Sequence, residues 1–114
     1  MSRNLAWSKE EIILALDLYF NPQRGTISST NTKFIELSAL LNQLKATTKI
    51  NDEEKFRNPN GVCLKLSNFL AIDPKYEGKG MRSYSKLDFE LFEKYSKNLS
   101  LLKSKATEIR KKIK

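Results

Sequence analysis

The residues whose types and spacing could bind a ligand lie around Asn58. Asparagine is a favoured helix N-cap and Pro59 suits the first helical position, so a helix is predicted to begin there. Along this helix, steps of three and four residues place four residues on one polar face: Asn58, Gly61, Lys65 and Asn68. Unpaired N–H groups at a helix N-terminus favour an anion, and glycine lets a phosphate or a base approach the backbone. The pattern therefore predicts an anion site at the start of this helix.

Two further groups of residues extend this candidate site. Arg57 precedes the cap and can form a bidentate contact with a phosphate or a guanine edge, while Asn60 lies in the first turn. Lys79 and Arg82 belong to a basic loop punctuated by glycines, which ends near Tyr84. An aromatic residue among cations suits nucleic acid, although a solvated loop has the same pattern. The alternative for the helix itself is an ordinary capped helix with a polar outer face.

Catalytic chemistry has no comparable support in the sequence. Histidine is absent and Cys63 is the one cysteine, which excludes the common catalytic triads and leaves too few ligands for structural zinc. The Gly78-Lys79-Gly80 segment lacks the spacing of a phosphate-binding loop. A small hydrolase would need scattered carboxylates to converge in the fold. We therefore expect a protein that is not an enzyme and that needs no metal or cofactor.

The net charge of +8 is distributed unevenly along the chain. Residues 97–114 hold seven basic residues and one acid, and thus account for +6 of the total. Binding of a polyanion is favoured by such clusters because neutralised phosphates release counterions. The alternative is that lysines simply decorate the surface. No segment resembles a signal peptide or approaches the roughly 20 apolar residues that span a bilayer, so a cytoplasmic protein with no membrane partner is expected.

The length of 114 residues suits one compact domain, and hydrophobic periodicity predicts its helices. Ser8 and Glu11 fit a capping box for a first helix that ends before Asn21. Further helices are expected over about residues 32–44, from 59 to about 70, and from 85 or 86 onward. A heptad stripe predicts a last helix: Leu99, Leu102, Ala106, Ile109 and Ile113. The predicted fold is mainly α, a compact bundle of four to five helices with long polar loops.

The same periodicity divides the chain and assigns part of its core. The inner side of the third helix is expected to carry Val62, Leu66 and Phe69. Residues 1–96 are expected to form a helical recognition domain. Residues 97–114 would be a basic C-terminal helix that serves either as a linker to a missing effector domain or as a seam for a dimer.

Several segments together carry a resemblance to a known family. They are W-S-K-E-E-I-I-L-A-L-D-L-Y from Trp7, F-R-N-P-N-G-V-C-L-K-L-S-N-F from Phe56, Asp73-Pro74, and G-K-G-M from Gly78. In this order they resemble the N-terminal domain ahead of HNH nuclease modules in McrA-like type IV restriction endonucleases, which are modification-dependent. The resemblance covers roughly residues 5 to 95. Members of this group are similar to sulfur-binding domains that recognise phosphorothioate DNA, and related domains read methylated bases.

The resemblance implies double-stranded DNA as the partner, with a phosphorothioate linkage as the feature that is read. It implies DNA contacts at these residues: Arg57, Asn58, Pro59, Asn60, Gly61, Lys65, Asn68, Lys79 and Arg82. Because sulfur is weakly hydrated, apolar walls would favour it over oxygen, and the candidate walls are Tyr19, Pro22, Arg57 and Pro59. Tyr19 has a competing assignment to the core.

The chain departs from this family in lacking an HNH module, because without histidine it cannot cut DNA by that route. A fused or associated HNH nuclease is therefore the expected effector of a restriction system for bacterial defence. Two alternatives stay open. The chain could read methylated bases, or it could be a helical protein-interaction module that pairs through its C-terminal heptad helix.

Overall fold

The computed structural model describes residues 7–48, 58–75 and 84–113 of the chain, without the side chains of residues 45–48 and 113. Over these ranges it contains five helices and no strand: α1 (Lys9–Tyr19), α2 (Thr32–Thr48), α3 (Pro59–Ile72), α4 (Lys86–Ser96) and α5 (Leu99–Ile113). The prediction of a mainly α bundle of four to five helices is confirmed. The second helix ends four residues later than about Leu44, and the good helix formers Lys45 and Ala46 are consistent with this extension.

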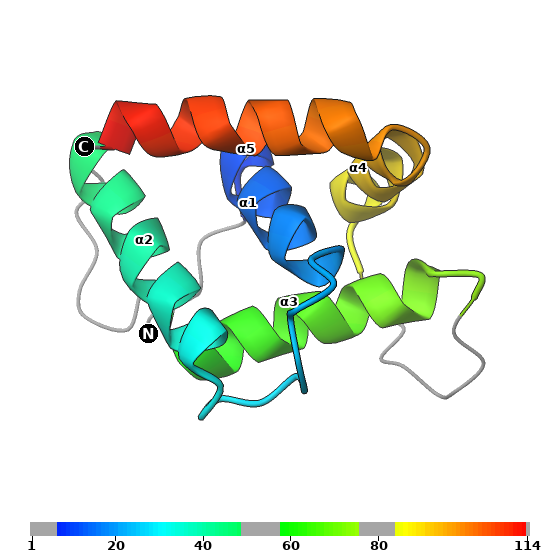
Figure 1. Cartoon of the computed structure of the whole chain (residues 1–114), viewed down its shortest axis with the longest axis horizontal. Coiled ribbons are helices and arrows are strands. Elements are labelled where there is room, and N and C mark those ends of the chain that lie inside the picture. Colours follow the sequence, from blue (N-terminus) through cyan, green and yellow to red (C-terminus); the bar gives the residue numbers. More distant parts are fainter. Residues whose placement is uncertain (1–6, 49–57, 76–83, 114) are drawn as a thin grey trace.

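Helix α1 is the centre of the bundle and packs against all four other helices. Figure 1 shows it between α5, which crosses the top of the view, and α3, which lies along the bottom. Its start is set by the predicted capping box, in which the Glu11 N–H donates to Ser8 Oγ and the Ser8 N–H donates to Glu11 Oε1. Nearly every side chain of α1 is buried, because a central helix has neighbours on all sides.

Helix α3 places its apolar side in the common core. Val62, Leu66 and Phe69 are completely buried, as the sequence predicts. At the far end of α3, Phe69 packs edge-on with Tyr19 and lies against Phe92 of α4. This aromatic cluster fixes the C-terminal ends of α1 and α3 beside each other.

Helix α5 belongs to the same core as the rest of the chain. The heptad residues Leu102, Ala106 and Ile109 are buried, and α5 packs against α1, α2 and α4. Two ion pairs reinforce its contact with α1: Arg110 with Asp17, and Lys112 with Glu10, each at 3.0 Å between nitrogen and oxygen. The expected boundary at residue 96 therefore does not separate two packing units.

The burial of the heptad stripe also bears on the expected dimer seam. Leu99 is the stripe residue that is exposed among those whose side chains the structure describes. A seam needs a continuous apolar surface along the helix, and α1 covers the middle of this one. The stripe is therefore used inside the bundle, and its middle is not open to a partner helix. Within the described residues, no helix is both long enough and apolar enough to cross a bilayer.

Candidate nucleic-acid interface

The predicted anion site begins at the first turn of α3, which is open to solvent. Asn58 caps the helix by accepting the Gly61 N–H at 2.8 Å through Oδ1, and the Val62 N–H donates to the Asn58 carbonyl. Pro59 has no N–H to offer. Among the described residues, this leaves the N–H of exposed Asn60 as the first-turn donor without a partner. The turn can therefore meet an anion, but with few donors.

Gly61 has a structural role beside the expected one. A Cβ at this position would lie 3.3 Å from Asn58 Oδ1, closer than an ordinary van der Waals contact. A larger residue would therefore press on the oxygen that caps the helix. The cap offers a reason for glycine that does not involve a ligand.

Lys65 lies inside the bundle, so its predicted place on the solvent-facing polar face is wrong. The side chain is 9% exposed, and its Nζ lies 3.1 and 3.0 Å from the two carboxylate oxygens of Asp88. The same Nζ sits 5.1 Å from the ring centroid of Trp7. Its charge is neutralised between α3 and α4. It supports the fold at this point and does not face a phosphate.

Asn68 continues the stripe into the packed region. It is half-buried, and its Oδ1 is enclosed without a hydrogen-bond partner in the described part of the chain. Of the four residues expected on one polar face, Asn58 and Gly61 lie at the open turn, whereas Lys65 and Asn68 lie in the packed part of α3. The stripe is therefore a short accessible end, not a long contact surface.

The fold does not bring two of the predicted sulfur-pocket walls, Tyr19 and Pro59, together. Tyr19 is 7% exposed, and its hydroxyl donates to Asp73 Oδ2 at 2.7 Å. Asp73 caps the C-terminal end of α3, whereas Pro59 begins it. At 1.5 Å per residue, the 14 residues of α3 separate these ends by about 21 Å. Tyr19 and Pro59 cannot line one pocket, and the assignment of Tyr19 to the core is confirmed.

The other predicted wall and loop residues have separate outcomes. Pro22 is exposed in the segment after α1. Arg57, Lys79 and Arg82 lie outside the described residues, so their roles stay predictions. At the edge of that basic loop, Tyr84 is exposed and stacks on Phe89 with 6.3 Å between ring centroids.

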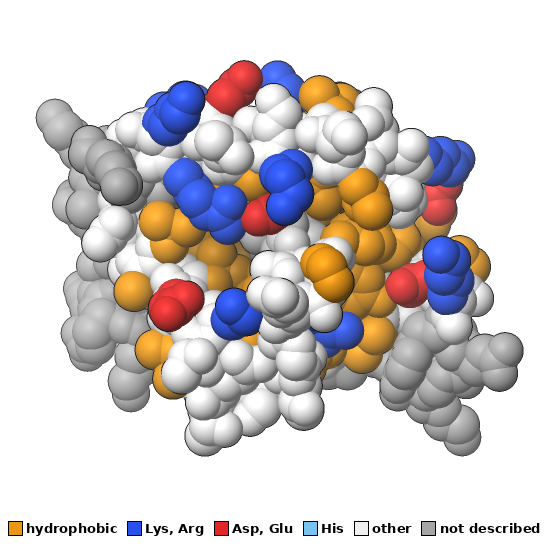
Figure 2. Space-filling model, viewed as in Figure 1, with side chains coloured by type: hydrophobic (Ala, Val, Ile, Leu, Met, Phe, Trp, Pro, Cys, Tyr) orange, Lys and Arg blue, Asp and Glu red, His pale blue; other side chains and the backbone are white. Residues whose placement is uncertain are grey.

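The outer side of α5 is a second surface that carries lysines and hydroxyls with one acid, here called the α5 face: Leu99, Ser100, Lys103, Ser104, Thr107, Glu108 and Lys111. All seven residues are exposed, and basic side chains gather over α5 in the upper part of Figure 2. Within the described residues, neither Lys103 nor Lys111 forms an ion pair. Ammonium and hydroxyl groups are common donors to DNA phosphates.

The predictions from sequence included the basic charges of this tail, but they did not include its hydroxyl residues as candidate binding groups. The signal was present, since Ser100, Ser104, Thr107 and Lys111 recur at steps of four, three and four. The predictions also missed Asp88 as the partner of Lys65. The capping box of Ser85 and Asp88 could have located that carboxylate at the start of α4.

These features define an all-helical bundle with an open, capped helix end and a separate basic helix face. Comparison with family models, curated proteins and solved structures finds no match to this chain. The described residues contain no group of three or more acidic, cysteine or histidine side chains that could hold a metal ion.

Proposed function

We propose that this chain is a non-catalytic DNA-binding module that holds the duplex mainly through backbone phosphates. The observation that carries this proposal is the α5 face, where Lys103 and Lys111 are exposed and form no ion pair with the described residues, although the acid Glu108 lies on the same face. The two lysines are eight residues apart, so their positions differ by about 12 Å along the helix and they can reach different phosphates. Arg110 and Lys112, in contrast, are engaged with acids of α1.

The proposal is tested by the salt dependence of DNA binding. Binding of a labelled duplex is measured by fluorescence polarisation at several salt concentrations, for the full chain and for the double variant Lys103→Gln/Lys111→Gln. For each phosphate that the variant no longer neutralises, the slope of log K against log salt is expected to become shallower by about 0.9. A matched variant, Lys9→Gln/Lys94→Gln, removes the same charge from α1 and α4. Equal slopes for the two variants would contradict the role of the α5 face.

We also propose which feature of the DNA the module recognises. The open end of α3 reads a modified linkage, and the modification is a phosphorothioate. The support is the sequence resemblance together with the exposed Asn60 beside the Asn58 cap. Helices α3 and α5 lie on opposite sides of α1 in Figure 1 and do not contact each other. Because the two surfaces face away from each other, they would contact different duplexes or different segments of one DNA, and backbone affinity and reading of the modification can be disturbed separately.

Matched duplexes that carry phosphorothioate, 5-methylcytosine or neither test the proposal that the chain reads a modified linkage. The full chain is expected to prefer the phosphorothioate duplex. Asn60→Asp places a carboxylate at the open turn and should remove the preference, because like charges repel there. Gln23→Glu is the control, since it makes the same chemical change at another exposed position. Equal affinity of the full chain for all three duplexes would refute modification reading, and preference for methylcytosine would replace phosphorothioate as the modification read.

A further inference from the structure

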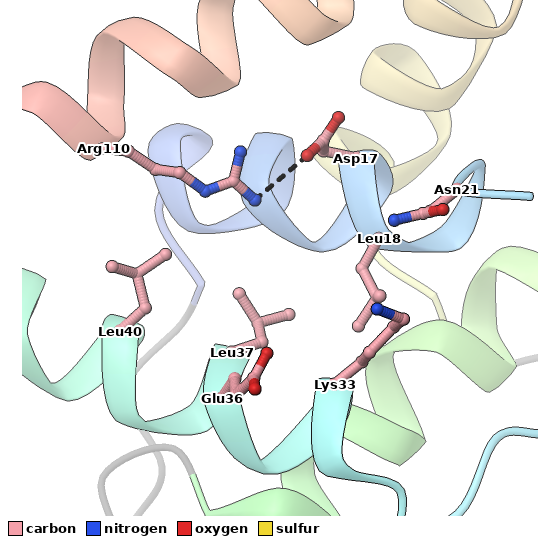
Figure 3. A pocket seen from close by; sticks show the side chains of 8 residues that line it. All are labelled: Asp17, Leu18, Asn21, Lys33, Glu36, Leu37, Leu40 and Arg110. Atoms are coloured by element: carbon pink, nitrogen blue, oxygen red, sulfur yellow. Dashed lines mark ion pairs between the residues drawn. The ribbon is translucent and has the colours of Figure 1, made fainter. Parts of the chain in front are cut away.

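A groove of about 180 Å³ lies between α1, α2 and α5. Figure 3 shows its side chains converging from these three helices and from Asn21, just after α1. The groove is lined by Asp17, Leu18, Asn21, Lys33, Glu36, Leu37, Leu40 and Arg110. At about 30 Å³ for each water, it has room for about six waters, which suits a small molecule and not a nucleotide.

The floor and the rim of the groove differ in chemistry. Leu18 and Leu37 are buried and Leu40 is half-buried, so the floor is apolar. Charged side chains stand around it, and in Figure 2 apolar side chains are likewise visible between acidic and basic ones. An apolar floor with a few converging polar groups is the usual form of a small-molecule site.

Much of the rim's bonding capacity is unused. Asp17 and Arg110 share one contact, 3.0 Å between Oδ2 and Nη2. Lys33 Nζ and the Glu36 carboxylate form no ion pair with the described residues. Two cations and two carboxylates therefore face one small groove, with one ion pair among them.

This balance of charge selects the ligand. A simple anion would meet both carboxylates of the rim, and a simple cation would meet both basic groups. A zwitterion satisfies both signs, and an aliphatic side chain would cover the leucine floor. We propose that the groove binds a free α-amino acid with an aliphatic side chain. Its carboxylate would bind Lys33 and Arg110, and its ammonium group would bind Glu36 and Asp17.

The proposal is independent of DNA binding, because a rim with no net charge does not attract a polyanion. It is tested on the full chain by isothermal titration calorimetry with three probes: L-leucine, N-acetyl-L-leucine and L-leucinamide. The second probe lacks the ammonium group and the third lacks the carboxylate. L-leucine is expected to bind about tenfold or more tightly than either, since each of the other two forms fewer charge-assisted hydrogen bonds. No heat with L-leucine, or equal affinity for all three probes, would overturn the proposal.

Two variants assign the binding to this groove. Lys33→Met and Glu36→Gln each remove one charge and keep most of the side-chain volume. Each is expected to weaken L-leucine binding about tenfold. Lys9→Met and Glu90→Gln make the same changes at exposed positions outside the groove and should leave affinity unchanged. Unchanged affinity in both groove variants would also overturn the proposal, and far-UV circular dichroism checks that each variant is folded.

Discussion

Lys65 shows how the role of a single residue depends on what surrounds it. Lysine is rarely buried unless it is paired, and here Asp88, which is 0% exposed, supplies both carboxylate oxygens. Asp88 also accepts the Ser85 N–H, so one side chain both caps α4 and neutralises α3. The lysine therefore links the start of α4 to the middle of α3.

Breaking this buried pair from one side should be strongly destabilising. Lys65→Met leaves the Asp88 carboxylate buried without its partner, and we expect the free energy of unfolding to fall by about 3–5 kcal/mol. Urea denaturation measures it. The control is Lys97→Met, which removes a lysine from the exposed pair with Glu93 and should cost less than about 1 kcal/mol. Equal destabilisation by both variants would mean that Lys65 is not held in the core.

Cys63 is expected to react slowly with thiol reagents. Burial raises the pKa of its thiol above the ordinary value, because the thiolate is poorly solvated there. The thiol therefore stays protonated at neutral pH, and alkylation by iodoacetamide at pH 8 should be slower than that of free cysteine. Its rate should rise toward free-cysteine behaviour in urea. An equal rate in the folded and unfolded chain would contradict this assignment.

At the scale of the element, α5 combines two surfaces of opposite chemistry. Its inner stripe packs on α1, and its outer side carries the lysines and hydroxyls of the α5 face. Its heptad spacing alone was interpreted as a linker to an effector domain or a seam for a partner helix. In the structure, the stripe packs in the core because α1 lies at the centre of the bundle and covers it.

A pair of leucines on α5 tests this assignment. Leu102 is 2% exposed and Leu99 is 46% exposed, one helical turn apart. Leu102→Ala should reduce the free energy of unfolding by about 2–5 kcal/mol because it removes buried apolar surface and leaves a cavity, whereas Leu99→Ala should change it little. Thermal or urea unfolding measures both. Similar small effects for both leucines would indicate that α5 is a separate segment and does not pack in the common core.

At the scale of the whole molecule, the described helices share one hydrophobic core around α1. A core shared in this way favours unfolding in a single cooperative step. It also places the open end of α3 and the α5 face on opposite sides of the bundle (Figure 1). The two surfaces proposed for DNA binding are therefore separate and are joined by one shared core.

Cooperative unfolding is the expected result for the full chain. Trp7 packs against the core near α3 and α4, so its fluorescence reports one side, while circular dichroism at 222 nm reports all helices. Both signals should give the same urea midpoint. Removal of residues 97–114 should abolish the cooperative transition, because it uncovers α1. Two separate midpoints in the full chain would show that α5 unfolds independently.

Local sequence determined much of the secondary structure of this protein. Ser8 with Glu11 and Asn58 with Pro59 carry their own start signals, since a cap is made by residues within one turn of it. The apolar side of α3 was also predicted from residue spacing, because Val62, Leu66 and Phe69 are large apolar residues that recur on one face of the helix.

Only the tertiary structure decided which side chains are accessible and which meet. Lys65 turned inward because Asp88, from another helix, offsets the cost of burying its charge. Tyr19 met Asp73 and not Pro59, because α1 crosses α3 near its C-terminal end. The groove of Asp17, Lys33, Glu36 and Arg110 likewise joins three helices. Contacts of this kind depend on how helices cross, and spacing along one helix does not contain that information.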